Sequence, residues 1–317
     1  MKKIIFEGVG TAMVTPMYED GKINYHVFKQ LLEMQIEKKA DAVIIAGTTG
    51  EGSTLSDEEH IALVEYAVKT VHGRIPVIAG AGSNNTAHAI YMSKQCEKVG
   101  ADGLLHVTPY YNKTSQQGLF LHFKACAEAT SLPIILYNVP SRTGVNIFPA
   151  TYKRLSEIDN IVACKEASGN FSQIAALCKD NLTIYSGNDD QITSALALGG
   201  KGVISVLSNI YPEETHQICT SYFAGDTEKS DSLQLQYLEL IEALFLDVNP
   251  IPVKQAMRAM GYEVGPCRLP LCDMDPTNAE KLYKTLKQYG LINGEVRAGS
   301  VTVSGMKNTG NVLRGNV

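Results

Sequence analysis

The sequence predicts an α/β fold, a (β/α)8 TIM barrel followed by a small C-terminal helical domain. Eight short runs rich in Val, Ile, Leu and Ala alternate with segments that have the apolar spacing of helices. The runs show no strict alternation of apolar and polar residues, which is typical of parallel strands covered on both faces. An open doubly wound sheet usually carries a glycine-rich dinucleotide loop after an early strand, and this sequence has none. The closed barrel is therefore favoured.

The expected strands are residues 9–15, 42–46, 76–79, 103–108, 134–138, 161–165, 182–186 and 202–207. Helices are expected between them at residues 25–39, 57–71, 86–99, 116–130 and 191–198, where apolar residues recur at helical spacing. After the last strand the chain continues as helices alone, at residues 212–225, 228–246, 253–260 and 278–289. We therefore divide the chain into a catalytic barrel, residues 1–225, and a C-terminal helical domain, residues 226–292.

Residues 293–317 differ from the rest in composition. They are rich in Gly, Ser, Thr and Asn and offer no large apolar face to bury. We expect a flexible tail or residues added for expression, whose deletion would leave turnover unchanged.

The overall composition excludes several classes of protein. Hydrophobic residues make up 44% and charged residues 19%, as in a packed globular chain. No apolar run approaches the roughly 18–20 residues that cross a bilayer, and no signal peptide is recognisable, so we expect no membrane partner. The net charge is −5 and basic residues form no dense cluster, so we expect no nucleic-acid partner. Seven cysteines without a C-x-x-C pair predict reduced thiols and a cytoplasmic protein.

Motifs of several other chemistries are missing. The sequence has no G-x-x-x-x-G-K-[ST] phosphate loop, no H-E-x-x-H, no G-x-S-x-G and no EF-hand loop. The seven histidines show no spacing that demands a metal ion. We therefore expect neither a metal nor a cofactor.

Lys165 is the most informative candidate residue, because active sites of this fold lie at the C-terminal ends of the strands. It follows the apolar residues 161–164, so its amine would enter a poorly hydrated space. Desolvation favours the neutral amine, which is the form that attacks a carbonyl. Spacing alone leaves a second interpretation open, in which Glu166 or another carboxylate holds the amine in a buried ion pair.

Other polar side chains follow the strands at the same end of the barrel. Thr48 and Thr49 lie in a glycine-bounded turn whose backbone N–H groups could bind an anion. A guanidinium such as that of Arg142 suits planar recognition of a carboxylate. Tyr137 and Tyr111 could act through their hydroxyl groups. For each of these residues a purely structural role in a turn, a loop or the core remains open at this point.

Taken together, these residues resemble the 4-hydroxy-tetrahydrodipicolinate synthase (dihydrodipicolinate synthase) family of the pyruvate-dependent class I aldolase superfamily. The resemblance runs from about residue 6 to 292 and rests on several long stretches in the family's order. These are GTTGE (47–51), IPVIAGAGSNNT (75–86), TPYYNK (108–113), YNVPSRTG (137–144), KEASGN (165–170), GGKGVISV (199–206) and NPIPVK (249–254).

The resemblance implies a reaction without metal or cofactor, in which pyruvate condenses with L-aspartate 4-semialdehyde through a lysine Schiff base. The product would be 4-hydroxy-tetrahydrodipicolinate, at the first committed step of the diaminopimelate and lysine pathway. The implied catalytic residues are Lys165, Tyr137, Thr48 and Tyr111. Tyr111 would reach in from a neighbouring subunit, which implies a homo-oligomer, usually a dimer of dimers.

The resemblance also implies substrate and effector contacts. Thr49 would bind the pyruvate carboxylate beside Thr48, Arg142 would bind the semialdehyde carboxylate, and the carbonyls of Gly187 and Ile204 would line the lysine pocket. Many members bind L-lysine at a dimer interface, and the matching positions here are His60, Asn84, His88 and Tyr110. Lysine-sensitive bacterial members carry a glutamate in place of His88. We therefore expect weak or absent inhibition by lysine.

Two other functions are alternatives to this one. Sister aldolases such as N-acetylneuraminate lyase or a 2-keto-3-deoxy sugar acid aldolase share the lysine, the tyrosine and a similar loop. Arg142 within PSRTG and the pair Tyr110-Tyr111 before Asn112 favour the synthase. A barrel that binds a small molecule without turnover is the second alternative, and the retention of the whole catalytic set argues against it.

Overall fold

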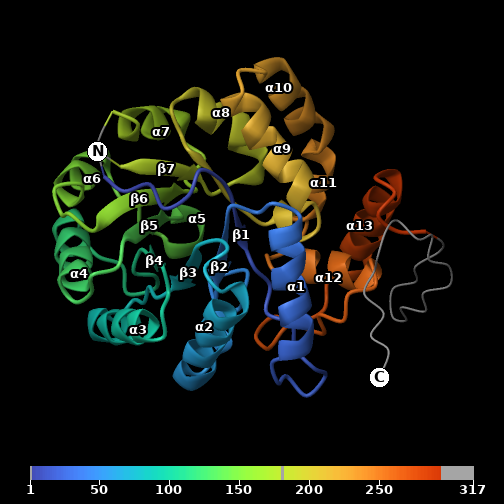
Figure 1. The fold of residues 1–317 in the computed structure, drawn as a ribbon, viewed down its shortest axis with the longest axis horizontal. Coiled ribbons are helices and arrows are strands. Elements are labelled where there is room, and N and C mark those ends of the chain that lie inside the picture. The colour runs from blue at the N-terminus through green and yellow to red at the C-terminus, as the bar shows by residue number, and fades with distance from the viewer. Residues whose placement is uncertain (1, 180–181, 294–317) are drawn as a thin grey trace.

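The computed structural model describes residues 2–179 and 182–293, and in it eight parallel strands close into a barrel (Figure 1). β1 pairs with β2 on one side and with β8 on the other, which closes the ring. The predicted fold class is confirmed. The strands are β1 (Gly8–Ala12), β2 (Ala42–Ile45), β3 (Val77–Gly80), β4 (Gly103–Val107), β5 (Ile134–Asn138), β6 (Ile161–Glu166), β7 (Thr183–Ser186) and β8 (Gly202–Ser205).

The helices α1 to α9 follow the strands around the barrel, and α10 to α13 come after them in the part of the chain that the structure describes (Figure 1). They are α1 (Tyr25–Glu37), α2 (Asp57–Val71), α3 (Thr86–Lys98), α4 (Gln116–Glu128), α5 (Pro140–Thr143), α6 (Pro149–Leu155), α7 (Phe171–Leu177), α8 (Ile192–Ala197), α9 (Pro212–Phe223), α10 (Thr227–Gln236), α11 (Leu238–Ala243), α12 (Ile251–Ala259) and α13 (Pro276–Gln288). Three 3-10 turns are η1 (Gly52–Thr54), η2 (Asp189–Gln191) and η3 (Leu207–Asn209).

Most boundaries of the expected elements agree with the structure to within two residues. One exception is the first strand, which ends at Ala12 rather than at residue 15. The last strand ends at Ser205 rather than at residue 207, because Asp189 Oδ2 accepts hydrogen bonds from the backbone N–H groups of Val206 and Leu207, each at 2.9 Å. The single helix expected at residues 228–246 is two helices, α10 and α11, that meet at Tyr237. The Tyr237 ring packs against the rings of Tyr211 and Tyr289, at centroid distances of 5.4 and 6.3 Å.

Strand residues alternate between the barrel interior and the helix layer, and β6 shows the consequence most clearly. Ala163 belongs to the cluster inside the barrel, whereas Cys164 packs in the larger cluster between sheet and helices. Because successive side chains of a strand point to opposite faces, Lys165 lies on the inner side and Glu166 on the outer side. Local strand geometry thus separates two adjacent charged residues.

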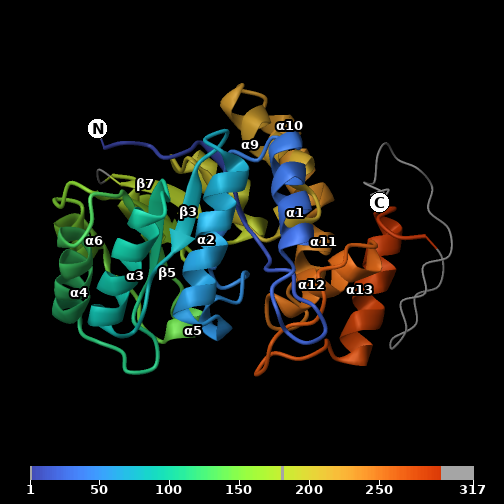
Figure 2. The same cartoon turned by 60° about the horizontal axis from the view of Figure 1, so that its bottom comes forward.

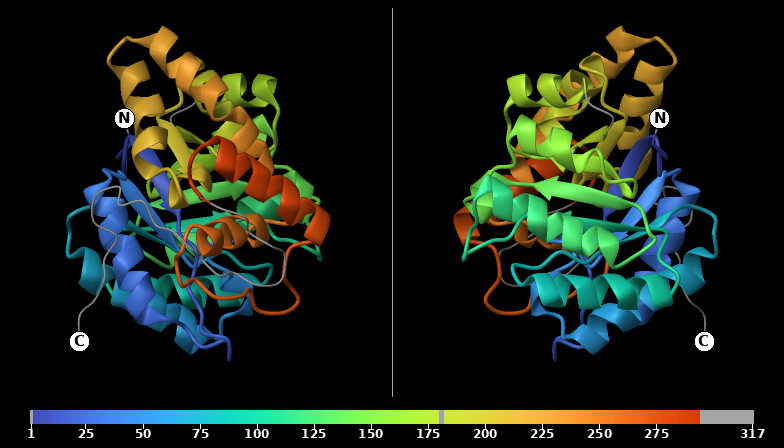
Figure 3. Two further views of the ribbon diagram at one scale, coloured as in Figure 1. Left: turned by 90° about the vertical axis from the view of Figure 1, so that its right-hand side faces the viewer. Right: turned by 90° about the vertical axis from the view of Figure 1, so that its left-hand side faces the viewer.

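The C-terminal helices pack outside the barrel, with α12 and α13 side by side and close to α1 (Figures 2 and 3). α12 also contacts η3, at the end of the barrel where the strands finish. The division of the chain at residues 225 and 226 stays a prediction. The prediction for residues 293–317 concerns a segment that, apart from residue 293, lies outside the described residues.

Within residues 2–179 and 182–293, no helix combines the length and the apolar character that a bilayer crossing requires. In the same ranges, no three His, Cys, Asp or Glu side chains come together in a group that could hold a metal ion.

Candidate active site

A cavity of about 220 Å³ opens at the C-terminal ends of the strands. It collects residues from seven strands or the loops that follow them, namely β1, β2, β4, β5, β6, β7 and β8, and two residues of the C-terminal segment, Phe245 and Asn249. Of the residues expected from the sequence, six line it, namely Thr48, Thr49, Tyr137, Arg142, Lys165 and Gly187. The structure therefore brings most of the predicted site together.

Lys165 is buried at the inner side of β6, and its side chain faces Tyr137 of the neighbouring strand. The two residues are register partners, and Lys165 Nζ lies 4.5 Å from the centroid of the Tyr137 ring. Only 6% of Lys165 is exposed, and it makes no ion pair among the described residues. Desolvation lowers the pKa of the Lys165 amine to about 8; Asp189 opposes this shift, and the Arg142 cation adds to it.

Glu166 does not neutralise Lys165. Its carboxylate lies on the outer face of β6, where it accepts hydrogen bonds from Asn138 Nδ2 at 3.0 Å and Gln173 Nε2 at 3.0 Å. The backbone N–H of Ser168 donates to the same carboxylate at 2.9 Å. The interpretation in which Glu166 holds the Lys165 amine as an ion pair is therefore wrong, because the two side chains occupy opposite faces of one strand.

Tyr137 keeps its proton in this environment. Its side chain is buried beside Lys165, and desolvation raises the pKa of the phenol. The Arg142 cation and a hydrogen bond with Thr48 offset part of that rise. A protonated phenol within reach of a neutral amine can donate a proton to an oxygen that leaves during imine formation.

The turn after β2 presents Thr48 and Thr49 to the cavity. Its shape is closed by hydrogen bonds from Glu51 N to Thr48 O and from Gly52 N to Gly47 O, each at 3.1 Å. Thr48 is exposed, whereas Thr49 is buried and its Oγ1 accepts a hydrogen bond from Asn249 Nδ2 at 3.0 Å. The turn therefore offers two hydroxyl groups and backbone N–H groups at one edge of the cavity.

Gly187 and Ile204 differ in their relation to the cavity. Gly187 lines it, and a Cβ at this position would lie 2.5 Å from the Ala167 Cβ, so only glycine fits. Ile204 is buried in the cluster inside the barrel and is not part of the cavity wall, where Val206 of the same chain segment is found. The predicted role of the Ile204 carbonyl is not tested by this geometry.

Arg142 lies on the short helix α5, which begins with Pro140, and it lines the mouth of the cavity. Its Nη2 donates to the backbone carbonyl of Asn249 at 3.3 Å. This contact fixes one edge of the guanidinium and leaves its other N–H groups available to a carboxylate.

Tyr111 is placed away from the cavity of its own chain. It is 92% exposed and has a positive φ of 69°, in the loop between β4 and α4. It lines neither of the two cavities at this end of the barrel. Any role in catalysis would therefore require a second copy of the chain.

A second cavity, of about 490 Å³, adjoins the first and shares Thr48, Tyr137 and Arg142 with it. Of the expected effector residues, His60, His88 and Tyr110 line it. Asn84 does not, but its Nδ2 donates to the Tyr110 carbonyl at 3.1 Å.

The histidines of the second cavity are engaged within the chain. His60 Nε2 donates to the Gly80 carbonyl at 2.6 Å, and burial lowers the pKa of His60. His88 Nε2 lies 2.9 Å from Asp57 Oδ1. The sequence analysis missed Asp57, because nothing in the spacing links the first residue of α2 to the first turn of α3.

A further set of residues that the sequence analysis did not single out joins the C-terminal segment to the turn after β2. Lys254 Nζ donates to Glu51 Oε1 at 2.8 Å, to Pro266 O at 2.6 Å and to Thr15 O at 3.2 Å. Glu51 Oε2 accepts from the backbone N–H of Arg268 at 2.8 Å. The presence of Glu51 in GTTGE and of Lys254 in NPIPVK was the available signal.

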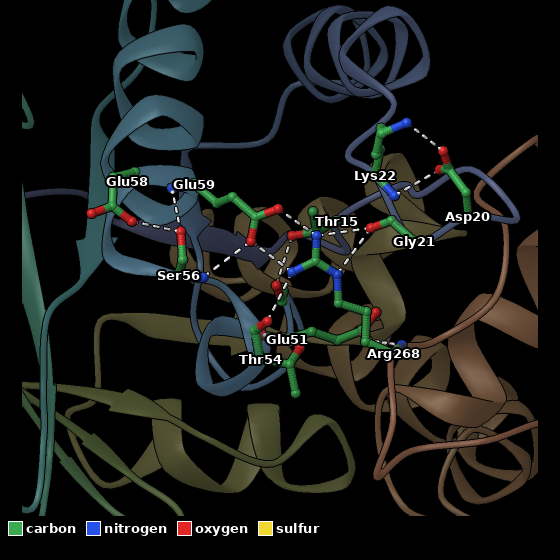
Figure 4. Close-up of polar contacts among 11 residues, drawn as sticks. Thr15, Asp20, Gly21, Lys22, Glu51, Thr54, Ser56, Glu58, Glu59 and Arg268 are labelled. Atoms are coloured by element: carbon green, nitrogen blue, oxygen red, sulfur yellow. Dashed lines mark hydrogen bonds and ion pairs between the residues drawn. The ribbon is translucent and has the colours of Figure 1, made fainter.

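Arg268 extends this network to the start of α2 (Figure 4). Its guanidinium contacts both oxygens of Glu59, at 2.6 and 2.7 Å, and donates to the carbonyls of Gly21 and Thr54. The bidentate contact lowers the pKa of Glu59. The segment after α12 is thus bound to the barrel by charged groups at several points.

Comparison with known proteins assigns the family. The profile of the Dihydrodipicolinate synthetase family matches residues 5–289. The chain belongs to this family. A relative from Acetivibrio thermocellus named 4-hydroxy-tetrahydrodipicolinate synthase is 55% identical over 293 residues, which cover 92% of this chain and all of the relative. A relative of the same name from Clostridium novyi is 51% identical over 294 residues, 92% of this chain and 99% of the relative.

Solved structures of the family agree with the fold. The dihydrodipicolinate synthase of Thermotoga maritima has a TM-score of 0.89 and 42% identity, covering 91% of this chain and all of the other. The enzyme from Cyanidioschyzon merolae, determined with lysine bound, has the same TM-score and identity and covers 92% of this chain and all of the other. The resemblance seen in the sequence motifs is therefore confirmed over nearly the whole described chain.

Proposed function

We propose that this chain catalyses the condensation of pyruvate with L-aspartate 4-semialdehyde to give 4-hydroxy-tetrahydrodipicolinate, the first committed step of the diaminopimelate and lysine pathway. The observation that carries the proposal is the buried amine of Lys165, which faces a cavity and has no ion-pair partner among the described residues. The shared names of the relatives at 51% and 55% identity support this substrate pair over those of the sister aldolases.

The chemistry begins with the lysine. A pKa of about 8 leaves roughly one Lys165 amine in ten neutral at pH 7, against about one in three thousand at the ordinary value of 10.5. The neutral amine attacks the ketone of pyruvate, and loss of water gives a protonated imine on Lys165. The imine withdraws electrons from the adjacent methyl group, which loses a proton and becomes a nucleophilic enamine.

The enamine carbon then attacks the aldehyde of the second substrate. The amino group of that substrate displaces Lys165 from the imine and closes the ring, which frees the lysine for another turnover. Tyr137 supplies and recovers protons in these steps, because burial keeps its phenol protonated. Thr48 connects Tyr137 to the cavity mouth, where Tyr111 of a neighbouring subunit would complete a relay of three hydroxyl groups.

The two carboxylates of the substrates have separate partners in this proposal. The turn with Thr48 and Thr49 binds the carboxylate of pyruvate, since hydroxyl and backbone N–H donors converge there. Arg142 binds the carboxylate of the semialdehyde at the cavity mouth. Gly187 leaves the space beside Lys165 open, and the carbonyl of Ile204 belongs to the same pocket in this proposal.

The proposal includes a homo-oligomer, arranged as a dimer of dimers, in the cytoplasm. The exposure of Tyr111 supports a site completed by a second copy of the chain. Mixing a Tyr111→Phe chain with a Lys165→Ala chain tests this arrangement. If Tyr111 acts across subunits, the mixed oligomer regains activity that neither parent has.

We propose in addition that the second cavity, with His60, Asn84, His88 and Tyr110, responds weakly or not at all to L-lysine. The support is the contact between His88 and Asp57, which occupies the carboxylate that a ligand's ammonium group would need. Titration of turnover with L-lysine tests this, and inhibition at micromolar concentrations would contradict it. A His88→Glu variant should gain sensitivity.

The decisive test of the function is pyruvate consumption with L-aspartate 4-semialdehyde, measured beside N-acetylmannosamine as a competing aldehyde. Borohydride reduction of the enzyme with pyruvate, followed by mass spectrometry, identifies the imine on Lys165. Consumption with the semialdehyde and labelling of Lys165 is the expected result. Activity only with the sugar would assign the chain to the sister aldolases, and labelling without turnover with either aldehyde would favour the non-catalytic alternative.

A further inference from the structure

Asn249, the second residue before α12, lies between the two substrate-binding groups of the cavity. Its side-chain Nδ2 donates to Thr49 Oγ1 at 3.0 Å, and its backbone carbonyl accepts from Arg142 Nη2 at 3.3 Å. It lines the same cavity as Lys165. Asn249 therefore contacts both the Thr49 hydroxyl, in the turn after β2, and the Arg142 guanidinium, on α5, although the three residues are far apart in the sequence.

The hydrogen bonding of this side chain is unfavourable for stability alone. Asn249 is 6% exposed, and its Oδ1 is buried without a hydrogen-bond partner in the part of the chain that the structure describes. A buried carbonyl without a hydrogen-bond partner destabilises the folded state by at least as much as one neutral hydrogen bond stabilises it. Among the described residues, the hydrogen bond to Thr49 is the only one that the Asn249 side chain makes. This single bond does not offset the destabilisation, which indicates that Asn249 has a role in the site.

The direction of the hydrogen bond explains that role. A threonine hydroxyl has one proton to donate and two lone pairs that accept. Because Asn249 Nδ2 donates to Thr49 Oγ1, the proton of the Thr49 hydroxyl cannot point toward Asn249 and is left for another acceptor. Thr49 lines the cavity, so a carboxylate bound there can receive this proton as a hydrogen bond.

We propose that Asn249 is a positioning residue, which orients the Thr49 hydroxyl so that it donates to the carboxylate of pyruvate. This inference rests on the proposed function, because it requires pyruvate at Lys165. The backbone carbonyl of Asn249 positions Arg142 independently of the side chain. A side-chain substitution therefore changes the binding of pyruvate and leaves the binding of the semialdehyde nearly unchanged.

A second contact between α12 and the turn after β2 stabilises the hydrogen bond between Asn249 and Thr49. Lys254, within the first turns of α12, is bound to Glu51, which follows Thr49 by two residues. The start of α12 is thus joined to one turn at two points, by a buried ion pair and by a hydrogen bond. These two contacts together hold the Asn249 amide at a fixed distance from the Thr49 hydroxyl.

Two substitutions of Asn249 separate orientation from mere packing. Asn249→Ala should raise the KM for pyruvate about tenfold, as expected for a lost hydrogen bond to a charged group, and leave the KM for the semialdehyde and kcat within about twofold. Asn249→Asp keeps the shape but can only accept a hydrogen bond, so it turns the Thr49 proton away from the substrate. It should raise the pyruvate KM more than Asn249→Ala does.

Asn160→Ala is the matched control. The Asn160 amide donates to three carbonyls, those of Ala127, Thr130 and Leu132, at the opposite end of the barrel. This control should lower the Tm and leave both KM values unchanged. Thermal unfolding of every variant shows whether the Asn249 variants are folded. Asn249→Asp is a second, isosteric variant that tests the proposal if Asn249→Ala fails to fold.

A double-variant cycle decides whether Asn249 acts through Thr49. In a Thr49→Val background, Asn249→Ala should have no further effect on the pyruvate KM, since no hydroxyl remains to be oriented. Equal effects of Asn249→Ala in both backgrounds would overturn the proposal, as would an Asn249→Asp variant that binds pyruvate as well as the parent enzyme. Borohydride trapping of pyruvate on the parent enzyme is run in parallel. Failure there would refute the Schiff-base function, whereas normal trapping with an unchanged pyruvate KM in Asn249→Ala would refute only the positioning role.

Discussion

Two buried lysines in this molecule lie in regions that use the same side chain for opposite purposes. Lys165, inside the barrel mouth, has no ion-pair partner among the described residues, and its pKa is lowered to about 8. Lys254, at the junction between α12 and the barrel, is 1% exposed and is bound to Glu51 and two carbonyls. Burial alone therefore does not make a lysine reactive. What distinguishes Lys165 is that no carboxylate of the described residues forms an ion pair with its amine, and a desolvated amine without such a contact gives up its proton more readily.

Removing Lys165 should have the largest effect on chemistry. Lys165→Ala deletes the nucleophile, so kcat should fall by at least a thousandfold, and borohydride with pyruvate should no longer label the protein. Lys201→Ala, which removes a surface lysine that pairs with Glu7, is the control and should keep full turnover. Normal turnover in Lys165→Ala would require the Schiff-base mechanism to be abandoned.

Removing Lys254 should have the largest effect on stability. Lys254→Ala leaves the Glu51 carboxylate buried without its cation, which should reduce the free energy of unfolding by about 3–5 kcal/mol. Denaturant unfolding measures this change. Replacing both partners, as Lys254→Met with Glu51→Gln, should recover part of the loss because no unpaired charge remains. A double variant less stable than Lys254→Ala would contradict the ion-pair explanation.

Arg142 should affect one substrate more than the other. Arg142→Ala should raise the KM for the semialdehyde by about tenfold to a hundredfold, the range expected for a charge-assisted contact. The rate of imine formation from pyruvate should change much less when it is measured by borohydride trapping at one pH. An equal loss in both measurements would argue against the assignment of Arg142 to the second carboxylate.

The smallest expected effect is a shift in the pH profile of imine formation. The rate should rise with pH through about 8, where the Lys165 amine loses its proton. The Arg142 cation disfavours the protonated lysine, so Arg142→Ala should move the profile to higher pH. Asp189 favours the protonated form, so Asp189→Asn should move it to lower pH. Identical profiles in all three proteins would show that neither charge acts on the lysine.

Much of the barrel could be predicted from the sequence, because each strand is a short apolar run that can be recognised from its own residues. The position of Lys165 could be predicted as well, since it follows the apolar residues of β6 directly. The helices α5, α6 and α7 were not predicted, because segments of four to seven residues contain few turns in which a helical period can show, although α8, which is of similar length, was expected at residues 191–198.

The contacts between distant segments could not be predicted. Asn249 reaches Thr49 across 200 residues, and the pairing of Asp57 with His88 crosses from α2 to α3. Such contacts depend on the closure of the barrel and on the packing of α12, and a single sequence carries no local sign of either. The choice between a catalytic and an ion-paired Lys165 likewise required the two faces of β6 to be distinguished.

The place of Asn249 in the chain has a consequence for the order in which the enzyme becomes competent during synthesis. All the barrel residues of the cavity, from Ala12 to Val206, leave the ribosome before Asn249 does. A nascent chain with a closed barrel would therefore hold its reactive lysine in a cavity whose wall is incomplete, and Asn249, just before α12, would add the last polar contact. Full affinity for pyruvate would therefore arise only when the C-terminal segment has docked, and the wall around the reactive amine would be the last part of the cavity to form within each chain.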